Sequence, residues 1–218
     1  MRLLGTTAVI CFGLAVCSSA AAQLVSAGTS RDLDRYRSLY TTSFPSGYTV
    51  DDVVGIGIAS DDDDHVYVWY DNGKVSAGTT KDLDKYRSPY SYSLPTGKTP
   101  YDILAMAIAT DNHVYVWYDD GTMSAGTSRD LDYYQSLSSY SVASGKDFED
   151  IVGIGIASDD HVYAWYIDGT VSAGTSSNLD RYRTAYSYST PIFLEPEDIV
   201  EMGIAEDDHV YSWYYYPE

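Results

Sequence analysis

The pattern of apolar and polar positions recurs four times along the chain. Residues 25–30, a Val-Ser-Ala-Gly-Thr-Ser segment, return almost unchanged at 75–80, 123–128 and 171–176. The copies therefore cover residues 25–74, 75–122, 123–170 and 171–218. The first copy has 50 residues and the others have 48, because acidic residues are added at 61–64. A period of this length, with several short strands per copy, is typical of β-propeller blades.

Each copy contains two strand patterns separated by an acidic turn. Residues 150–157 form a short apolar run rich in β-branched residues and glycine, and residues 161–166 form a second run rich in aromatic residues. The Val-Ser-Ala-Gly-Thr segment follows as a third strand. The pairs that precede this third strand favour type I′ hairpin turns, in which both central residues have positive φ; they are Asn72-Gly73, Asp120-Gly121 and Asp168-Gly169.

Residues 30–37 follow a different pattern, which predicts one or two helical turns. Ser30 supplies a hydroxyl N-cap and Asp32 places an acid in the first turn. Leu33 and Tyr36 are three positions apart, and an arginine ends the segment. Segments such as 186–189 then alternate as an outer strand should, and linkers such as 95–97 lead to the next copy.

The two ends of the repeat region are incomplete in complementary ways. The first copy begins with a third strand at 25–29, and the last copy stops after a second strand at 209–214. Pairing these segments would complete one blade and remove two open strand edges. We therefore predict an all-β fold, a four-bladed β-propeller of four repeats of about 48 residues, whose last blade is closed by the N- and C-terminal strands. Two chains that close a larger ring are the alternative.

Small residues recur in the first strand of each copy, which suits four strands that crowd around a narrow axis. Glu201 is the exception in the fourth copy. The small residues are Gly55, Gly57, Ala105, Ala107, Gly153, Gly155 and Gly203.

An acid stands before each first strand, and the second strand is aromatic, as in His113-Val-Tyr-Val-Trp-Tyr118. With four units over residues 25–218, this arrangement resembles the hemopexin-type four-bladed propeller and, more loosely, the tectonin-like lectin propellers. The resemblance implies ions in a central channel and a role in binding.

Residues 1–22 are typical of a cleaved signal peptide. A positive start is followed by an uncharged apolar stretch at 3–16 and by small residues before Gln23. A lipoprotein anchor at Cys17 is the alternative, because residues 14–17 approach a lipobox. Cys11 and Cys17 both lie in this segment, so the mature domain, 23–218, would contain no disulfide. We expect a secreted or periplasmic protein without membrane insertion after cleavage.

The charge balance restricts the ligands. There are 13 basic and 32 acidic residues, a net charge of −19; loss of Arg2 with the signal leaves 12 against 32, or −20. Such a surface repels nucleic acid and anionic lipid. Cations, neutral glycans and protein ligands remain.

One candidate site is a ring of four aspartates, one at the mouth of each inner strand: Asp52, Asp102, Asp150 and Asp198. Four converging carboxylates would hold Ca²⁺ or another cation in the channel. The alternative is that each carboxylate accepts backbone N–H groups from a blade linker.

The histidines and tryptophans recur in register, and we interpret both sets as structural core. The histidines are His65, His113, His161 and His209, and the tryptophans are Trp69, Trp117, Trp165 and Trp213. Each histidine follows acids that suit either a turn or a metal ion. Tyrosines outside the repeat register are freer to serve a surface; they are Tyr48, Tyr101, Tyr133, Tyr215 and Tyr216.

No catalytic residues are predicted. Catalysis usually needs an asymmetric set of acid, base and nucleophile, whereas every histidine here is one of four equivalents. The sequence favours a non-enzymatic binding module with repeated sites for a glycan or a protein and no required cofactor. A structural scaffold with a cation in its central channel is the alternative.

Overall fold

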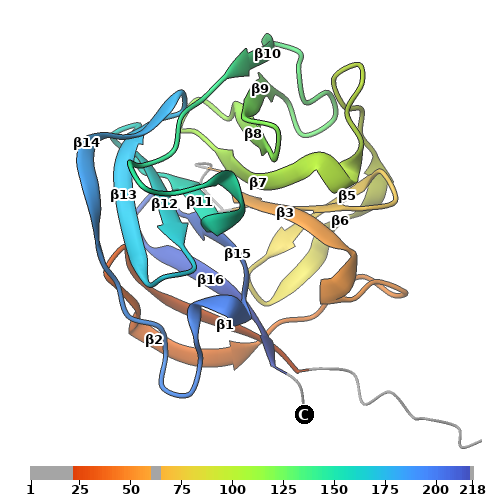
Figure 1. Ribbon diagram of the computed structural model, residues 1–218. Coiled ribbons are helices and arrows are strands. Elements are labelled where there is room, and N and C mark those ends of the chain that lie inside the picture. The colour runs from red at the N-terminus through yellow and green to blue at the C-terminus, as the bar shows by residue number, and fades with distance from the viewer. Residues whose placement is uncertain (1–21, 60–64, 217–218) are drawn as a thin grey trace, which may run out of the picture.

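The computed structural model describes residues 22–59 and 65–216, which form four antiparallel sheets around one axis (Figure 1). Each sheet has four strands, so the chain is a four-bladed β-propeller, as the repeat predicts. Residues 1–21 of the signal peptide proposed at 1–22, the anchor alternative at Cys17 and the acids at 61–64 lie outside the described residues.

From the axis outwards, blade I contains β3 (Val53–Ile58), β4 (Val66–Tyr70), β5 (Lys74–Thr79) and β6 (Asp82–Ser91). Blade II contains β7 (Ile103–Ile108), β8 (Val114–Tyr118), β9 (Thr122–Gly126) and β10 (Gln135–Ser139). Blade III contains β11 (Ile151–Ile156), β12 (Val162–Tyr166), β13 (Thr170–Thr175) and β14 (Asn178–Ser187). Blade IV contains β15 (Ile199–Ile204), β16 (Val210–Tyr216), β1 (Ala22–Thr29) and β2 (Asp32–Thr41).

A short 3₁₀ helix precedes each innermost strand: η1 (Val50–Asp52), η2 (Pro100–Asp102), η3 (Phe148–Asp150) and η4 (Pro196–Asp198). Figure 1 views the propeller from the side that carries these helices, which we name the 3₁₀ face. The opposite side, the turn face, carries the acidic turns between the first and second strands. None of the helices in the described chain has the length and apolar character needed to cross a bilayer.

Blade IV is assembled from both ends of the described chain. β1 pairs antiparallel with β16, which places Val25 opposite Trp213 and Ala27 opposite Tyr211. Both strands also have a partner on their other side, so neither presents an open edge. The predicted closure is confirmed, and one chain completes the ring.

The hydrophobic core consists of four buried clusters, each lying between two neighbouring blades. The four tryptophans belong to these clusters and are at most 2% exposed. Small residues on the innermost strands make room for the next blade. A Cβ on Gly55 would lie 2.4 Å from Sδ of Met106, and one on Gly153 would lie 2.6 Å from Cγ of Met202. The crowding therefore comes from the neighbouring blade's side chains rather than from the axis itself.

The helical turns predicted after the third strand are wrong, because this segment forms the outer strand. In blade I, the Ser76 hydroxyl donates to the Leu83 carbonyl oxygen at 2.7 Å and lies 3.0 Å from the Tyr70 hydroxyl. Both Tyr70 and Leu83 are fully buried. The leucine carbonyl is thus already bonded, whereas a helix would need it for an N–H four residues later. The same tyrosine–serine–leucine relay recurs in the other three blades.

The hairpin turns before the third strand also differ from the type I′ prediction. Gly73 has a φ of 76°, but Asn72 is not among the residues with positive φ. The Gly73 N–H donates to the Tyr70 carbonyl oxygen at 3.1 Å. A turn closed this way, followed by one left-handed glycine, matches the type I turn with a G1 bulge. Gly121 and Gly169 repeat this geometry.

One linker residue has an unfavourable backbone conformation. Phe193 has a φ of 74°, where the other linkers have Gly47, Gly97 and Gly145 at 86°, 89° and 82°. Its side chain is 92% exposed, and that of neighbouring Ile192 is 77% exposed. A bulky residue in the left-handed region is strained, and its exposed ring recovers little packing energy.

The buried relay predicts a stability loss that is specific to one serine. Ser76→Ala leaves the Leu83 carbonyl and the Tyr70 hydroxyl without their shared partner, so the free energy of unfolding should fall by about 1–3 kcal/mol. Chemical denaturation measures this change. The matched control is Ser88→Ala on the exposed part of β6; it should change stability by less than about 0.5 kcal/mol. Equal effects of the two substitutions would contradict the relay.

The strained linker predicts a stabilising substitution. Phe193→Gly removes the left-handed strain and loses almost no buried surface, so the free energy of unfolding should rise by about 1 kcal/mol. The reciprocal change, Gly97→Ala, should lower it by a similar amount because Gly97 also has positive φ. Both shifts are measured by chemical denaturation. A destabilised Phe193→Gly variant would show that the phenylalanine side chain has a packing role.

Candidate functional site

Pockets recur between neighbouring blades on the turn face. They measure about 330 Å³ between blades I and II, 280 Å³ between blades II and III, and 260 Å³ between blades III and IV. Residues 60–64, which follow β3 in the sequence of blade I, lie outside the described chain. These volumes fall near the lower limit for small-molecule sites.

Each pocket takes one tyrosine from each of its two blades. In the pocket between blades III and IV these are Tyr163 and Tyr36. Tyr115 and Tyr182 occupy the same places in the pocket between blades II and III, and Tyr67 and Tyr134 do so between blades I and II. The second tyrosine of each pair is half-exposed, at 52–56%. A phenol ring is therefore available to a ligand in every described pocket.

Polar groups and an apolar floor complete the lining. Between blades III and IV, Asp159, Asp207 and Asp208 join Ser30 and Thr29, while Ala157, Ile204 and Val210 supply apolar surface. Carboxylates accept hydrogen bonds, and hydroxyl groups both donate and accept them. The pocket can therefore bind a ligand that has hydroxyl groups and an apolar face.

The histidines support the pocket tyrosines and do not belong to the core. His113, His161 and His209 are half-buried, and their rings lie 3.9, 4.5 and 4.2 Å from those of Tyr134, Tyr182 and Tyr36, measured between centroids. A preceding aspartate lies 3.0, 2.5 or 2.7 Å from each Nδ1. In blade I, His65 lies 4.4 Å from Tyr86. Each histidine thus orients the ring that its pocket exposes.

The tryptophans fix the pocket wall across the blade interface. The indole N–H groups of Trp69, Trp117 and Trp165 donate to the carbonyl oxygens of Ser128, Ser176 and Ser30, at 3.2, 2.9 and 3.1 Å. Those serines line the three pockets. The indole nitrogen of Trp213 is buried and has no partner within the described residues. The interface between blades IV and I therefore lacks this bond.

Acidic turn residues connect neighbouring blades beside the pockets. Asp208 accepts hydrogen bonds from the Ser158 backbone N–H at 2.9 Å and from its hydroxyl at 3.1 Å. Asp160 accepts one from the Thr110 hydroxyl at 3.2 Å. Both acids have positive φ, as Asn112 does at the same position in blade II. The turns are thus held in a fixed orientation at the pocket rim.

Tyr115 and Tyr163, the more buried tyrosines of two pockets, stay neutral over a wide pH range. Burial raises the pKa of Tyr115, and the carboxylates of Asp111 and Asp160 raise it further. Burial likewise raises the pKa of Tyr163. Both phenols therefore remain hydrogen-bond donors at neutral pH.

Sequence reasoning missed the half-exposed tyrosines of the pockets. The sequence predicts a helical turn around Tyr36, and neither Tyr134 nor Tyr182 was predicted to belong to a site. A signal was present, because a tyrosine between charged or polar residues returns in every copy, including Tyr86. A tyrosine on a solvent-exposed strand is not expected to recur in every copy unless its ring contacts another group.

The four aspartates expected to share a cation bind their own linkers instead. Asp52, Asp102, Asp150 and Asp198 each accept the backbone N–H of the residue three positions earlier, at 2.6–2.8 Å. The bonds from the N–H and the hydroxyl of Thr99 lower the pKa of Asp102. Within the described chain no group of three His, Cys, Asp or Glu side chains is arranged to hold a metal ion. The structure thus shows the linker arrangement that the sequence left as the alternative.

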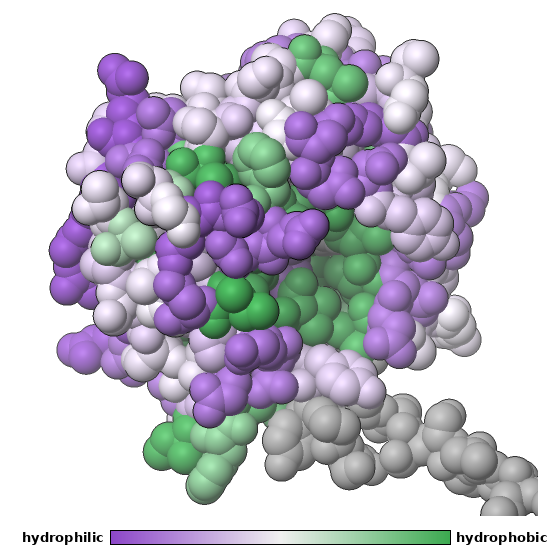
Figure 2. All heavy atoms as spheres, in the orientation of Figure 1, coloured by the Kyte–Doolittle hydropathy of each residue, from purple (hydrophilic) through white to green (hydrophobic). Residues whose placement is uncertain are grey.

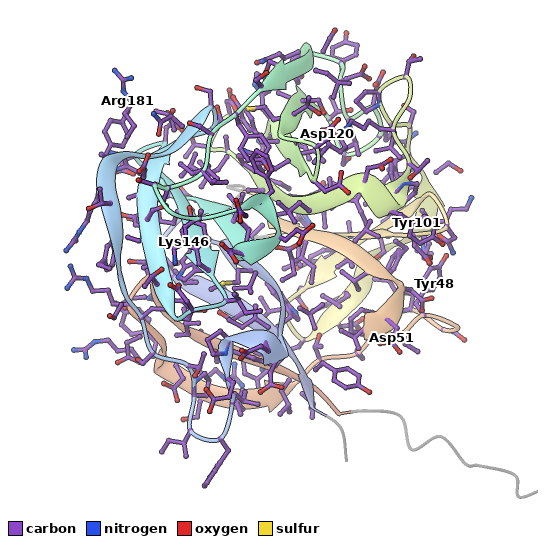
Figure 3. All side chains as sticks on the ribbon, in the orientation of Figure 1. Tyr48, Asp51, Tyr101, Asp120, Lys146 and Arg181 are labelled. Carbon is purple, nitrogen blue, oxygen red and sulfur yellow. The ribbon has the colours of Figure 1, made fainter. Side chains whose placement is uncertain are left out.

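Two lysines on the 3₁₀ face pair with hairpin acids. Lys98 lies 2.6 Å from Asp120, and Lys146 pairs with Asp168. Figure 3 labels one residue of each pair, Asp120 and Lys146. The ammonium groups also lie over the buried rings of Tyr118 and Tyr166, at 4.5 and 5.1 Å from their centroids. These contacts tie the linkers of blades II and III to the hairpins of the same blades.

The centre of the 3₁₀ face is a hollow lined by apolar side chains, with hydrophilic residues around it (Figure 2). Val54, Leu104 and Val200 line it from three innermost strands. Glu201 also lines this hollow and is only 3% exposed. Burial raises the pKa of Glu201 well above its usual range, although a hydrogen bond from the Met202 N–H opposes the shift.

No protein-family model matches this sequence, and neither does any curated protein. Among solved structures, the chain is similar to PorZ, described as an essential surface component of the type-IX secretion system of Porphyromonas gingivalis. The identity is 13% and the TM-score 0.35, over 77% of this chain and 18% of PorZ. It is also similar to the WD40 β-propeller domain of Doa1, with 10% identity and a TM-score of 0.36, over 74% of this chain and 50% of that one.

The buried glutamate predicts a pH-dependent penalty on folding. The folded state binds the Glu201 proton more tightly than the unfolded state does. The bound proton therefore stabilises the folded state most at pH values below the pKa that Glu201 has in the unfolded chain. Stability is then lost as the pH rises towards the folded pKa. Glu201→Gln cannot ionise, so its stability relative to the native protein should increase between about pH 5 and about pH 8. Chemical denaturation at both pH values tests this, and a constant difference would contradict it.

Proposed function

We propose that this protein is an exported, non-enzymatic binding module whose blade-interface pockets each bind one unit of a neutral glycan. The observation that supports this proposal most directly is the recurrence of one pocket composition at three interfaces. Each pocket combines a half-exposed tyrosine, a second tyrosine, carboxylates, hydroxyl groups and an apolar floor.

The lining suits a sugar ring on two grounds. The apolar C–H face of a sugar packs against a phenol ring, while sugar hydroxyl groups donate to carboxylates and exchange hydrogen bonds with serine and threonine. The acidic residues beside each pocket, in a chain with a net charge of −19, disfavour anionic sugars. A neutral glycan is therefore the ligand class.

Repetition compensates for the small size of each pocket. A site of about 260–330 Å³ encloses few ligand atoms, so we expect weak binding per site. Several sites that face the same side of the ring bind a branched or surface-attached glycan together and gain affinity through a high effective concentration. The resemblance of the repeat to hemopexin-type propellers, and more loosely to tectonin-like lectin propellers, also favours a role in binding.

The absence of an enzymatic role is also part of the proposal. The histidines nearest the pockets pack against tyrosine rings and aspartates, in the same way in blades II, III and IV. Repeated equivalent contacts of this kind suit repeated binding better than a single catalytic set.

A triple substitution tests the pockets. Combining Tyr36→Ala, Tyr134→Ala and Tyr182→Ala removes the exposed ring from every described pocket, and glycan affinity should fall by about tenfold or more. Retention of the native protein and the variant on an array of neutral glycans measures the change.

The matched control is Tyr101→Ala, which removes a tyrosine that is 76% exposed on the 3₁₀ face. It should bind glycans as the native protein does. Glycan binding that survives the triple substitution, or a native protein that binds no neutral glycan on a broad array, would disprove the proposed function.

A further inference from the structure

The hollow on the 3₁₀ face differs from the turn-face pockets in both lining and symmetry. Its volume is about 270 Å³, and its walls include Val53, Val54, Ile103 and Leu104 of blades I and II. It reaches across the axis to Val200 and Glu201 of blade IV. We name it the axial funnel. Because only blade IV places an acid on this innermost strand, the funnel is not fourfold.

Glu201 has an unusual environment for a carboxyl group. It stands where the other blades have Gly55, Ala105 and Gly153, and it is 3% exposed. Within the described residues its only hydrogen bond comes from the Met202 N–H, at 3.1 Å from Oε1. A carboxyl group can form several hydrogen bonds, and Glu201 lines the funnel, so it has capacity for a further partner there. A buried polar group with unused capacity is costly unless something binds it.

The funnel rim adds negative charge and an aromatic ring. Asp51 and Asp71 both line it, and the Tyr101 hydroxyl donates to Asp71 at 3.3 Å. Figure 3 labels Asp51 and Tyr101, which extend from the 3₁₀ helices of neighbouring blades. No lysine or arginine is among the lining residues. The field in the funnel therefore attracts cations.

We propose that the axial funnel binds the ammonium group of an alkylamine, with the charge against Glu201 and the alkyl stem against the valine and leucine walls. An ammonium group donates three hydrogen bonds and complements a carboxylate. The apolar walls suit the stem in the same molecule.

A bare metal ion fits this site less well. Divalent cations need several oxygen ligands close together, whereas Glu201 is the only buried carboxylate among the lining residues, and no group of three acidic side chains in the described chain is arranged to hold a metal ion. A hydrated ion would leave the apolar walls in contact with water. An alkylammonium ion needs only one anionic partner and covers the apolar surface with its own stem.

Isothermal titration with n-butylammonium chloride tests this proposal. We expect roughly millimolar affinity for so small a ligand. Glu201→Gln keeps the shape of the side chain and cannot form the carboxylate that the bound ammonium group would favour, so affinity should fall by about tenfold or more. The matched control is Glu149→Gln, which removes one exposed charge from the same face without touching the funnel; affinity should change less than about twofold.

Neutral and inorganic probes separate the two parts of the site. Binding of n-butanol as tight as that of n-butylammonium, or equal binding by the native protein and Glu201→Gln, would overturn the proposal. So would competition by sodium at equal concentration.

A blocked lysine, Nα-acetyl-lysine methylamide, identifies the source of the ammonium. If it binds as n-butylammonium does, lysine side chains of a partner enter the funnel; if only n-butylammonium binds, the ligand is a free amine. Both results support an ammonium site.

Discussion

Close packing between neighbouring blades is the constraint on which the rest of the structure depends. Each innermost strand must accept large side chains from the next blade, so a glycine stands opposite Met106 in one interface and opposite Met202 in another. The indole N–H bonds that cross three of the four interfaces add direction to this packing. Because each interface packs in the same way, the pockets left between blades on the turn face have similar linings at the three interfaces described.

The two faces use this framework differently. On the turn face, repetition yields equivalent pockets, and the histidines hold a tyrosine in each of them. On the 3₁₀ face, a single departure from the repeat makes one asymmetric funnel, because Glu201 replaces a small residue in one blade only. Repeated sites favour many weak contacts with one ligand class. A unique site favours one ligand held in one orientation, so the same ring can serve two separate recognition tasks.

The sequence predicts the architecture well because the repeat and the incomplete ends report long-range pairing directly. Local conformation was harder to predict. The segment after the third strand has helical signals, but two hydrogen bonds hold it as a strand. The Ser26 hydroxyl donates to the Leu33 carbonyl oxygen, and the Leu33 N–H donates to the Ser189 carbonyl oxygen in the linker between blades III and IV. Neither bond leaves a trace in local propensity. The hydrogen bonds of the four aspartates were hard to predict for a similar reason, since spacing along the chain cannot show that each carboxylate bonds a group only three residues away. The pocket tyrosines lie on exposed strands, where composition alone suggests ordinary solvent contact.

The pairing of β1 with β16 has a consequence for how the protein is made. The two strands meet across 188 positions of sequence, as the contact between Ser26 and Tyr214 shows. Because β1 leaves the ribosome long before β16, the closing blade cannot form until all of the described blades have been synthesised. Until then blade IV is incomplete, because β1 lacks its β16 partner. The ring of blades is therefore complete only when β16 has paired with both β1 and β15.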